Sequence, residues 1–179
     1  MQTPARGSLV TDRSFGRYVR FVRSRLIDVA LHLFARRGVD GVSIAEIAVA
    51  AGASKANVMH HFGSKDGLYA ACLDVIDAHL HAAVDTAVET GDLPAALEGW
   101  VAEHPDDLRV MAYGLLRLPE RDGRWALSSP VTRMIDLVGG PDAVGTVVDL
   151  LGTVTYREMA RPLVEAYLTD ESNQREETA

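Results

Sequence analysis

The sequence has little of what would mark a secreted or membrane-bound protein. It contains one cysteine, Cys72, in 179 residues, so no intramolecular disulfide can form and the cytoplasm, a reducing compartment, is the expected location. No apolar run approaches the ~20 residues that span a bilayer. The N-terminus carries arginines but no apolar segment of the kind found in secretory signals. We therefore expect no membrane partner.

The motifs of catalysis are also missing. The sequence has no glycine-rich phosphate loop, no metal-ligand spacing and no GxSxG elbow. Adjacent residues on a helix diverge by about 100°, so the pair His60 and His61 does not form a metal site, and His79 and His81 also point apart. Asp106 and Asp107 open a helix, where the dipole accounts for them. We expect no enzyme activity, no cofactor and no metal.

Composition and charge favour a helical protein with a basic head. Hydrophobic residues make up 47% and charged residues 24% of the chain, with only seven prolines. The net charge is −7, but residues 1–72 hold ten Lys/Arg against five Asp/Glu, whereas residues 73–179 hold eight against twenty. A basic head on an acidic body concentrates contacts with a polyanion at one end.

Apolar periodicity between about Arg20 and Leu80 predicts a helix-turn-helix unit. A first helix runs to Arg37 with Leu26, Ala30, Leu33 and Phe34 on one stripe, and Gly38 stops it. Ser43 and Glu46 form a capping box at the start of a short helix that ends at Gly52. Ser54 can cap a second short helix to about residue 61. Two short helices joined by a glycine-containing turn are typical of DNA-binding proteins.

The rest of the chain also predicts helices, so the expected fold class is all-α. A long helix follows Ser64 to about residue 89, and further helices cover 93–103, 105–118, 130–138 and 142–168, the last kinked or divided by Pro162. The expected organisation is a flexible basic arm at 1–19, a three-helix DNA-binding domain at 20–66, a C-terminal helical ligand-binding and dimerisation domain at 67–168, and a disordered acidic tail at 169–179. The arm either follows DNA or is merely solvated.

Residues 23–76, RSRLIDVALHLFARRGVDGVSIAEIAVAAGASKANVMHHFGSKDGLYAACLDVI, resemble the DNA-binding domain of the tetracycline-repressor-like (TetR) family. The resemblance covers the first helix, the SIAEIAVAAGAS helix and turn, the SKANVMHHF helix and the FGSKDGL entry to the next helix. It implies an all-α homodimer whose C-terminal domain binds a small molecule and whose second short helix enters the major groove of a pseudo-palindromic operator.

Within that resemblance, the predicted DNA-binding residues surround the second short helix. Lys55 can donate to guanine or phosphate and Asn57 has the amide geometry for adenine, while the starts of the flanking helices suit phosphate contacts. The full set is Ser43, Ser54, Lys55, Asn57, His60, His61 and Lys65. We expect Lys55→Ala and Lys65→Ala to weaken DNA binding and leave the fold intact. Met59 replaces a frequent tyrosine and cannot donate to phosphate, and Gly67 replaces the usual acidic residue.

The C-terminal half offers two sets of apolar residues. Candidates for a ligand pocket are Trp100, Met111, Tyr113, Trp125, Met134 and Tyr156. Candidates for a dimer face are Val144, Val147, Val148, Leu151, Val154, Met159 and Leu163. At helical spacing either set could be plain core. The leading hypothesis is a ligand-responsive repressor that binds DNA as a dimer, and the alternative is a DNA-binding regulator whose C-terminal domain only dimerises or binds a protein partner.

Overall fold

The computed structural model describes residues 9–116 and 128–176, and within these ranges every regular element is a helix. This agrees with the predicted all-α class. The chain divides into two compact units, Met1–Cys72 and Leu73–Ala179. Among the described residues no single helix is long and apolar enough to cross a membrane; the pair Ser129–Val138 and Ala143–Pro162, bent by 118°, meets that test of length and composition only jointly.

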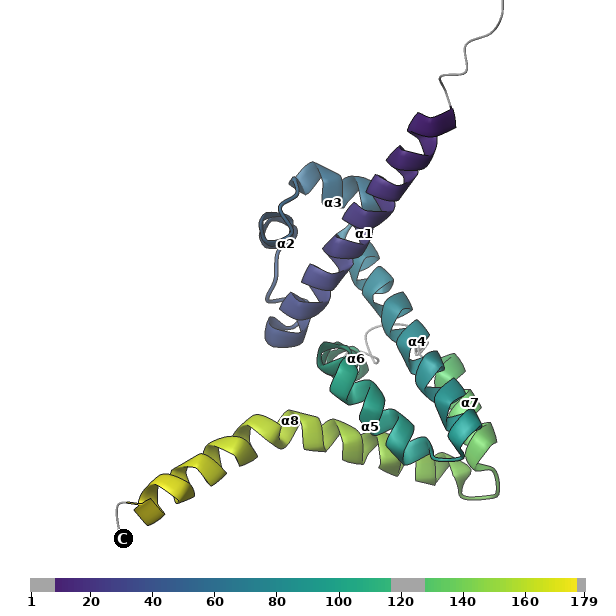
Figure 1. Ribbon diagram of the computed structural model, residues 1–179, viewed down its shortest axis with the longest axis vertical. Coiled ribbons are helices and arrows are strands. Elements are labelled where there is room, and N and C mark those ends of the chain that lie inside the picture. Colours follow the sequence, from purple (N-terminus) through teal and green to yellow (C-terminus); the bar gives the residue numbers. More distant parts are fainter. Residues whose placement is uncertain (1–8, 117–127, 177–179) are drawn as a thin grey trace, which may run out of the picture. The chain divides into compact units, whose positions relative to one another are not determined.

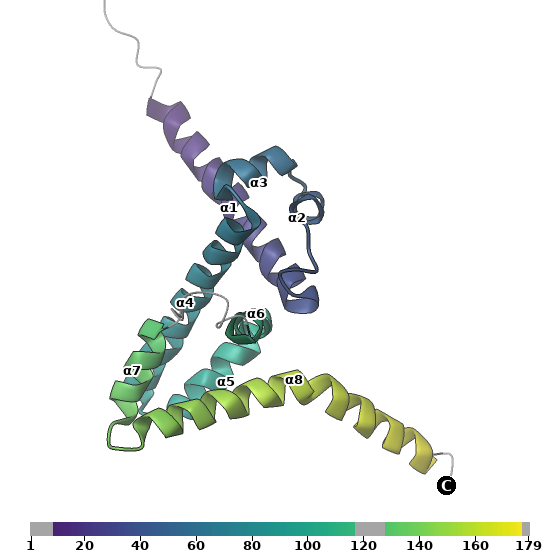
Figure 2. The same ribbon diagram turned by 180° about the vertical axis from the view of Figure 1, so that it is seen from behind.

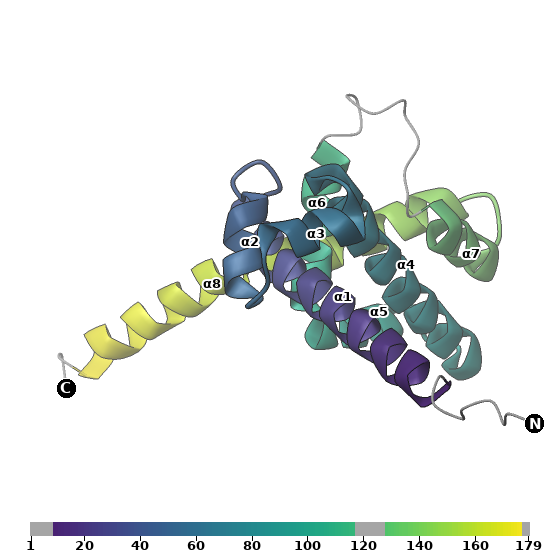
Figure 3. The same ribbon diagram turned by 90° about the horizontal axis from the view of Figure 1, so that it is seen from above.

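The first unit consists of three helices and the first turns of a fourth. These are α1 (Leu9–Arg37), α2 (Ile44–Ala50), α3 (Lys55–Phe62) and the start of α4 (Lys65–Thr90). Helix α2 packs against both α1 and α3 (Figures 1 and 3). The core contains Leu26, Phe34, Ile47, Val58 and Leu68, all fully buried, and each stabilises the unit by roughly 1.5–3 kcal/mol.

The second unit consists of the rest of α4 with α5 (Leu93–Glu103), α6 (Pro105–Leu116), α7 (Ser128–Val138) and α8 (Ala143–Glu176). Helix α8 contacts α5, α6 and α7. Helix α7 lies beside α4 (Figures 1 and 2), where Arg133 Nη2 donates to Asp85 Oδ1 at 2.6 Å. The core of the second unit includes Leu97, Trp100, Leu108 and Met134.

Helices α1 and α8 are longer than the sequence predicts. Helix α1 begins at Leu9 rather than Arg20, so residues 9–19 of the predicted flexible arm are helical, while residues 1–8 lie outside the described residues. Helix α8 continues through Pro162 to Glu176, so 169–176 of the predicted disordered tail are helical too. The second segment includes Glu171, Gln174 and Glu176, whose helix propensity is high, and a single glycine such as Gly16 in the first costs only about 1 kcal/mol.

The boundary between the units falls later than the predicted 66/67. The first two turns of α4 belong to the first unit because Leu68, Tyr69, Ala71 and Cys72 are all buried. The Tyr69 ring packs edge-on against Phe34, with centroids 6.0 Å apart. Cys72 is fully buried, as expected of a small hydrophobic side chain.

Candidate nucleic-acid interface

The start of α2 is held by the predicted capping box. Ser43 Oγ accepts from the Glu46 backbone amide at 3.2 Å, and the Ser43 amide donates to Glu46 Oε2 at 2.8 Å. Arg37 Nη1 lies 2.8 Å from Glu46 Oε1. The hydrogen bonds from Ser43, with the Arg37 guanidinium, lower the pKa of Glu46 to about 2. This end of α2 is therefore fixed to the end of α1.

The turn between α2 and α3 depends on Gly52. Its φ is 64°, a left-handed conformation that a side chain disfavours. The Ala53 amide donates to the Ala48 carbonyl at 2.8 Å, which closes the turn. Ser54 then caps α3, because its Oγ accepts from the Asn57 amide at 3.1 Å. The serine fixes where α3 starts, as predicted.

The structure brings three of the predicted DNA-binding side chains to the exposed surface of α3. Val58 is fully buried and anchors the helix on the core, while Lys55, Asn57 and His60 are exposed. Met59 is 41% exposed. These positions give α3 a polar surface with one cation and one amide, the groups that read base edges and phosphates.

His61 differs from its neighbour. It is partly buried, and burial, followed by the charges of His60 and Arg23, lowers its pKa. Its ring lies next to Phe62, over which the Arg23 guanidinium is placed at 5.3 Å. A neutral, half-covered imidazole is less suited to a phosphate contact than His60 is.

Lys65 has a structural role that the sequence analysis missed. Its Nζ donates to the carbonyls of Val39 at 3.0 Å and Val42 at 3.4 Å, in the loop between α1 and α2. The ammonium group thereby ties the start of α4 to that loop. We therefore expect Lys65→Ala to lower the stability of the fold as well, because two backbone carbonyls would lose a charged donor.

Gly67 is explained by a close backbone approach. A Cβ placed on Gly67 would lie 2.0 Å from the Phe62 carbonyl oxygen. The Gly67 amide also donates to Ser64 Oγ at 2.9 Å. The departure from an acidic residue at this position thus reflects how tightly the first turn of α4 meets the end of α3.

A cavity of about 520 Å³ lies between α4 and α5 in the second unit. Its walls are mostly small side chains, among them Ala82 and Ala83 from α4 and Ala95, Ala96 and Gly99 from α5. Trp100 also lines it, and its buried Nε1 has no hydrogen-bond partner within the described part of the chain. His79 and His104 stand at the same cavity.

Of the five predicted pocket residues that the structure describes, Trp100 alone lines this cavity. Met111 and Met134 are 2% and 0% exposed in the core, whereas Tyr113 and Tyr156 are 40% and 76% exposed. Trp125 lies outside the described residues. The prediction favoured large apolar side chains, but small ones on two facing helices make the space. The run of alanine and glycine at helical spacing in α5 was the available signal.

The predicted dimer face on α8 separates into two sides. Val147 and Val154 are buried in the second unit. Val144, Val148 and Met159 are exposed, as are Tyr156 and Val164. Leu151 is half-buried, and the side chain of Leu163 lies outside the described ones.

Comparison with known proteins begins with a family model. Residues 26–72 match the model described as "Bacterial regulatory proteins, tetR family". The chain is 37% identical over 103 residues to the HTH-type transcriptional regulatory protein RaaS of Mycobacterium tuberculosis. This alignment covers 58% of the chain and 47% of RaaS, so the chain spans about half the length of that relative. It is 29% identical over 167 residues to the HTH-type transcriptional repressor SCO4008 of Streptomyces coelicolor, covering 79% and 83%.

Solved structures share the fold. A member of the TetR family from Streptomyces coelicolor, SCO1917, superposes with a TM-score of 0.63 at 18% identity, covering 80% of this chain and 88% of that one. The multidrug binding protein EbrR, complexed with imidazole, superposes with a TM-score of 0.59 at 20% identity, covering 78% and 80%. At these identities the likeness concerns the fold alone.

Proposed function

We propose that the chain is a transcriptional repressor of the TetR family, because residues 26–72 match the model of that family and the chain resembles the repressor SCO4008 over most of its length. In this proposal it binds a pseudo-palindromic operator as a homodimer, responds to a small molecule, and works in the cytoplasm, where that DNA lies.

The observation that best supports DNA binding is the pair of capped helices α2 and α3. Ser43 and Ser54 fix the two helix starts, and α3 carries Lys55, Asn57 and His60 on its exposed surface. With α3 in the major groove, Asn57 would pair with adenine and Lys55 with guanine or a phosphate. The backbone amides next to Ser43, at the start of α2, would hold a neighbouring phosphate.

Support for a homodimer comes from an unpartnered ridge on α8. Val144, Val148, Tyr156 and Val164 are exposed and are spaced by multiples of four residues, with Gly152 and Ala160 between them. Ridges of residues four apart are what two helices interdigitate when they cross. Val148, Gly152, Tyr156, Ala160 and Val164 also line one shallow groove. Exposed apolar groups of this number on one helix favour a partner, and a second copy of the same chain offers a matching surface.

Support for a small-molecule effector comes from the cavity between α4 and α5. Its volume of about 520 Å³ falls in the range of ligand sites, roughly 300–1,000 Å³. It combines apolar walls with a few polar residues, including Thr86, Thr90 and Asp92. A well-packed interior would have favoured the alternative, in which the C-terminal domain only dimerises or binds a protein, and this cavity favours the sensor. Of the relatives, SCO4008 is named a repressor and EbrR a multidrug binding protein.

Regulation would follow from a shift of populations. Helix α4 begins in the first unit and lines the cavity in the second. In this scheme α4 has two arrangements, one that binds DNA and one that does not. A ligand that prefers the second arrangement lowers DNA affinity by at most the ratio of its affinities for the two arrangements. A coupling of 1–3 kcal/mol, typical of such systems, corresponds to about 5–150-fold in operator affinity.

A gel-shift assay across the upstream region of the protein's own gene tests the repressor proposal. We expect a sequence-preferring complex at moderate salt, at least about 10³-fold tighter than binding to unrelated DNA. Asn57→Ala removes the amide that would read adenine and should relax this preference by about 1–3 kcal/mol. The variant Asn173→Ala at the far end of α8 is the matched control. Binding without sequence preference in the wild type would contradict the proposal.

A further inference from the structure

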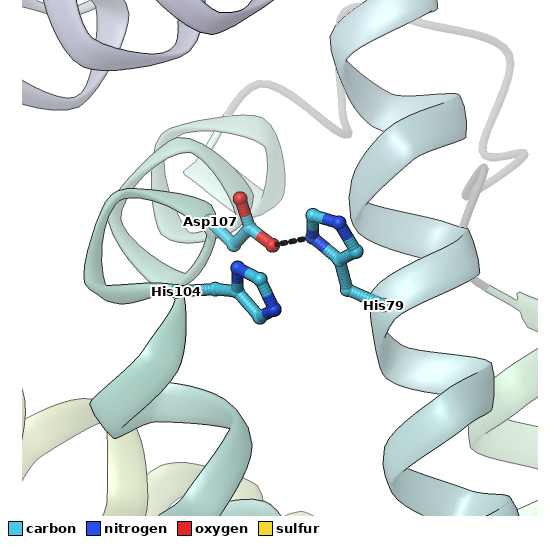
Figure 4. Close-up of side chains that lie close together, drawn as sticks. All are labelled: His79, His104 and Asp107. Atoms are coloured by element: carbon cyan, nitrogen blue, oxygen red, sulfur yellow. Dashed lines mark hydrogen bonds and ion pairs between the residues drawn. The ribbon is translucent and has the colours of Figure 1, made fainter.

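Three metal-ligating side chains meet in the second unit. His79 comes from the middle of α4, His104 is the residue that ends α5, and Asp107 lies in the first turn of α6 (Figure 4). One donor atom from each lies within 4.8 Å of the other two. His79 Nδ1 is 2.6 Å from Asp107 Oδ2, and the two imidazole rings stack with centroids 3.8 Å apart.

The carboxylate of this cluster is buried. Among the described residues, Asp107 and Glu158 are the two buried acidic side chains, each 3% exposed. Glu158 faces two guanidinium groups, those of Arg109 and Arg161. Within the described part of the chain, the ion-pair partner of Asp107 is His79, which carries charge only if protonated. A buried carboxylate needs a compensating cation, and the amides at the start of α6 supply only a partial one.

The cluster also opens on the α4–α5 cavity. His79 and His104 both line that cavity and are half-buried, so a small ion can reach their rings from it. The ring of His104 makes no hydrogen bond within the described part of the chain and stacks on the ring of His79. Its ring nitrogens are thus available as ligands.

We propose that His79, His104 and Asp107 bind a divalent transition-metal ion, with Zn²⁺ as the best match. Two imidazoles and one carboxylate suit zinc and its neighbours in the first transition row, whereas Mg²⁺ and Ca²⁺ take oxygen ligands alone. Three protein ligands leave a fourth position, and two of the three, His79 and His104, line the cavity. Water or an anionic group of a cavity ligand would occupy that position.

Binding requires a local rearrangement of the two rings. Zinc lies about 2.0–2.2 Å from its ligands and close to the plane of each imidazole, and two parallel rings stacked at 3.8 Å cannot both contain the metal in their planes. One ring must turn. His104 is the one with no hydrogen bond to break, so its ring turns while Asp107 exchanges its contact with His79 for one with the metal. The ion would then cross-link α4 to the junction of α5 and α6.

Metal titration of the full, untagged chain tests this inference. After treatment with a chelator, we expect one equivalent of Zn²⁺ per chain to bind and raise the midpoint of thermal unfolding. Co²⁺ should bind the same site and give the visible absorption bands of a four-coordinate complex. His104→Ala should weaken both by at least about 100-fold, since even outer partners of a ligand are worth 10–100-fold. This variant loses no hydrogen bond, so it should fold.

His81→Ala is the matched control, because His81 also faces a carboxylate, that of Asp77, at 3.3 Å on the same helix but lies outside the cluster. It should bind metal as the wild type does. The inference is overturned if the wild type takes up no stoichiometric metal, if His104→Ala binds unchanged, or if His81→Ala loses binding equally. The assay uses no DNA, so its outcome is independent of the proposed repressor function.

Discussion

The chain has two lysines, Lys55 and Lys65, and replacing each with methionine should produce opposite phenotypes. Methionine keeps most of the aliphatic stem and removes the ammonium group. Lys65 Nζ donates to two carbonyls, at 3.0 Å and 3.4 Å. A hydrogen bond from a charged group contributes about 1.5–3 kcal/mol net. Because Lys65 is only part-buried and the second bond is long, we expect a total near the value for one bond.

Lys65→Met should therefore lower the unfolding free energy by about 1.5–3 kcal/mol. For a chain of this size each kcal/mol moves the thermal midpoint by roughly 2–4 °C, so the expected drop is roughly 3–12 °C by circular dichroism. Lys55 is exposed, and Lys55→Met should stay within about 0.5 kcal/mol of the wild type. In gel shifts at several salt concentrations, Lys55→Met should instead lower the salt slope by about one unit if it contacts a phosphate.

One pair of results would contradict the structural role of Lys65. If Lys65→Met unfolds at the wild-type temperature while its operator affinity and salt slope fall as in Lys55→Met, Lys65 contacts phosphate and does not hold the loop between α1 and α2. If Lys55→Met keeps the salt slope and the sequence preference of the wild type, Lys55 does not contact DNA.

Further predictions concern the capping box, the first turn of α4 and the dimer. Because the pKa of Glu46 falls from 4.5 to about 2 on folding, the stability that this carboxylate contributes is complete above pH 4.5 and is lost as the pH falls toward 2. In acid unfolding, Glu46→Gln should therefore lose less stability than the wild type over this window. If stability falls equally steeply with pH in both proteins, Glu46 does not have the lowered pKa. Gly67→Ala should cost about 1–3 kcal/mol in thermal unfolding, whereas Gly145→Ala, where a Cβ meets nothing within 4 Å, should gain up to about 1 kcal/mol. Val148→Asp should yield monomers in light scattering, while Val88→Asp, with 58% rather than 60% exposure, should not; two dimeric variants would exclude the α8 ridge.

Features set by neighbouring residues were predicted from the sequence. The capping box of Ser43 and Glu46, the Gly52 turn and the Ser54 cap each involve groups within a few residues of one another, so residue type and spacing determine them. The exposed surface of α3 followed from the same spacing, because Val58 had to face inward.

Features set by packing between distant segments were not predictable. Lys65 reaches carbonyls 26 and 23 residues away, and His79 meets Asp107 across 28 residues. On α8, periodicity found apolar positions but could not say which stripe the second unit buries. That choice depends on where α5, α6 and α7 lie. The extra length of α1 was missed because Gly16 and polar neighbours outweighed helix propensity in the sequence pattern.

The contact between Gly67 and the Phe62 carbonyl also determines how a signal could travel. With no side chain between them, and with the Ser64 and Leu68 amides bonded to the carbonyls of Phe62 and Ser64, α3 and the first turn of α4 have no room to pivot. We expect them to move together as one rigid body. Under the proposed function, a small rotation of α4 would therefore rotate α3 with it. The position of α3 in the major groove would then change through this rotation and not through bending between the two helices.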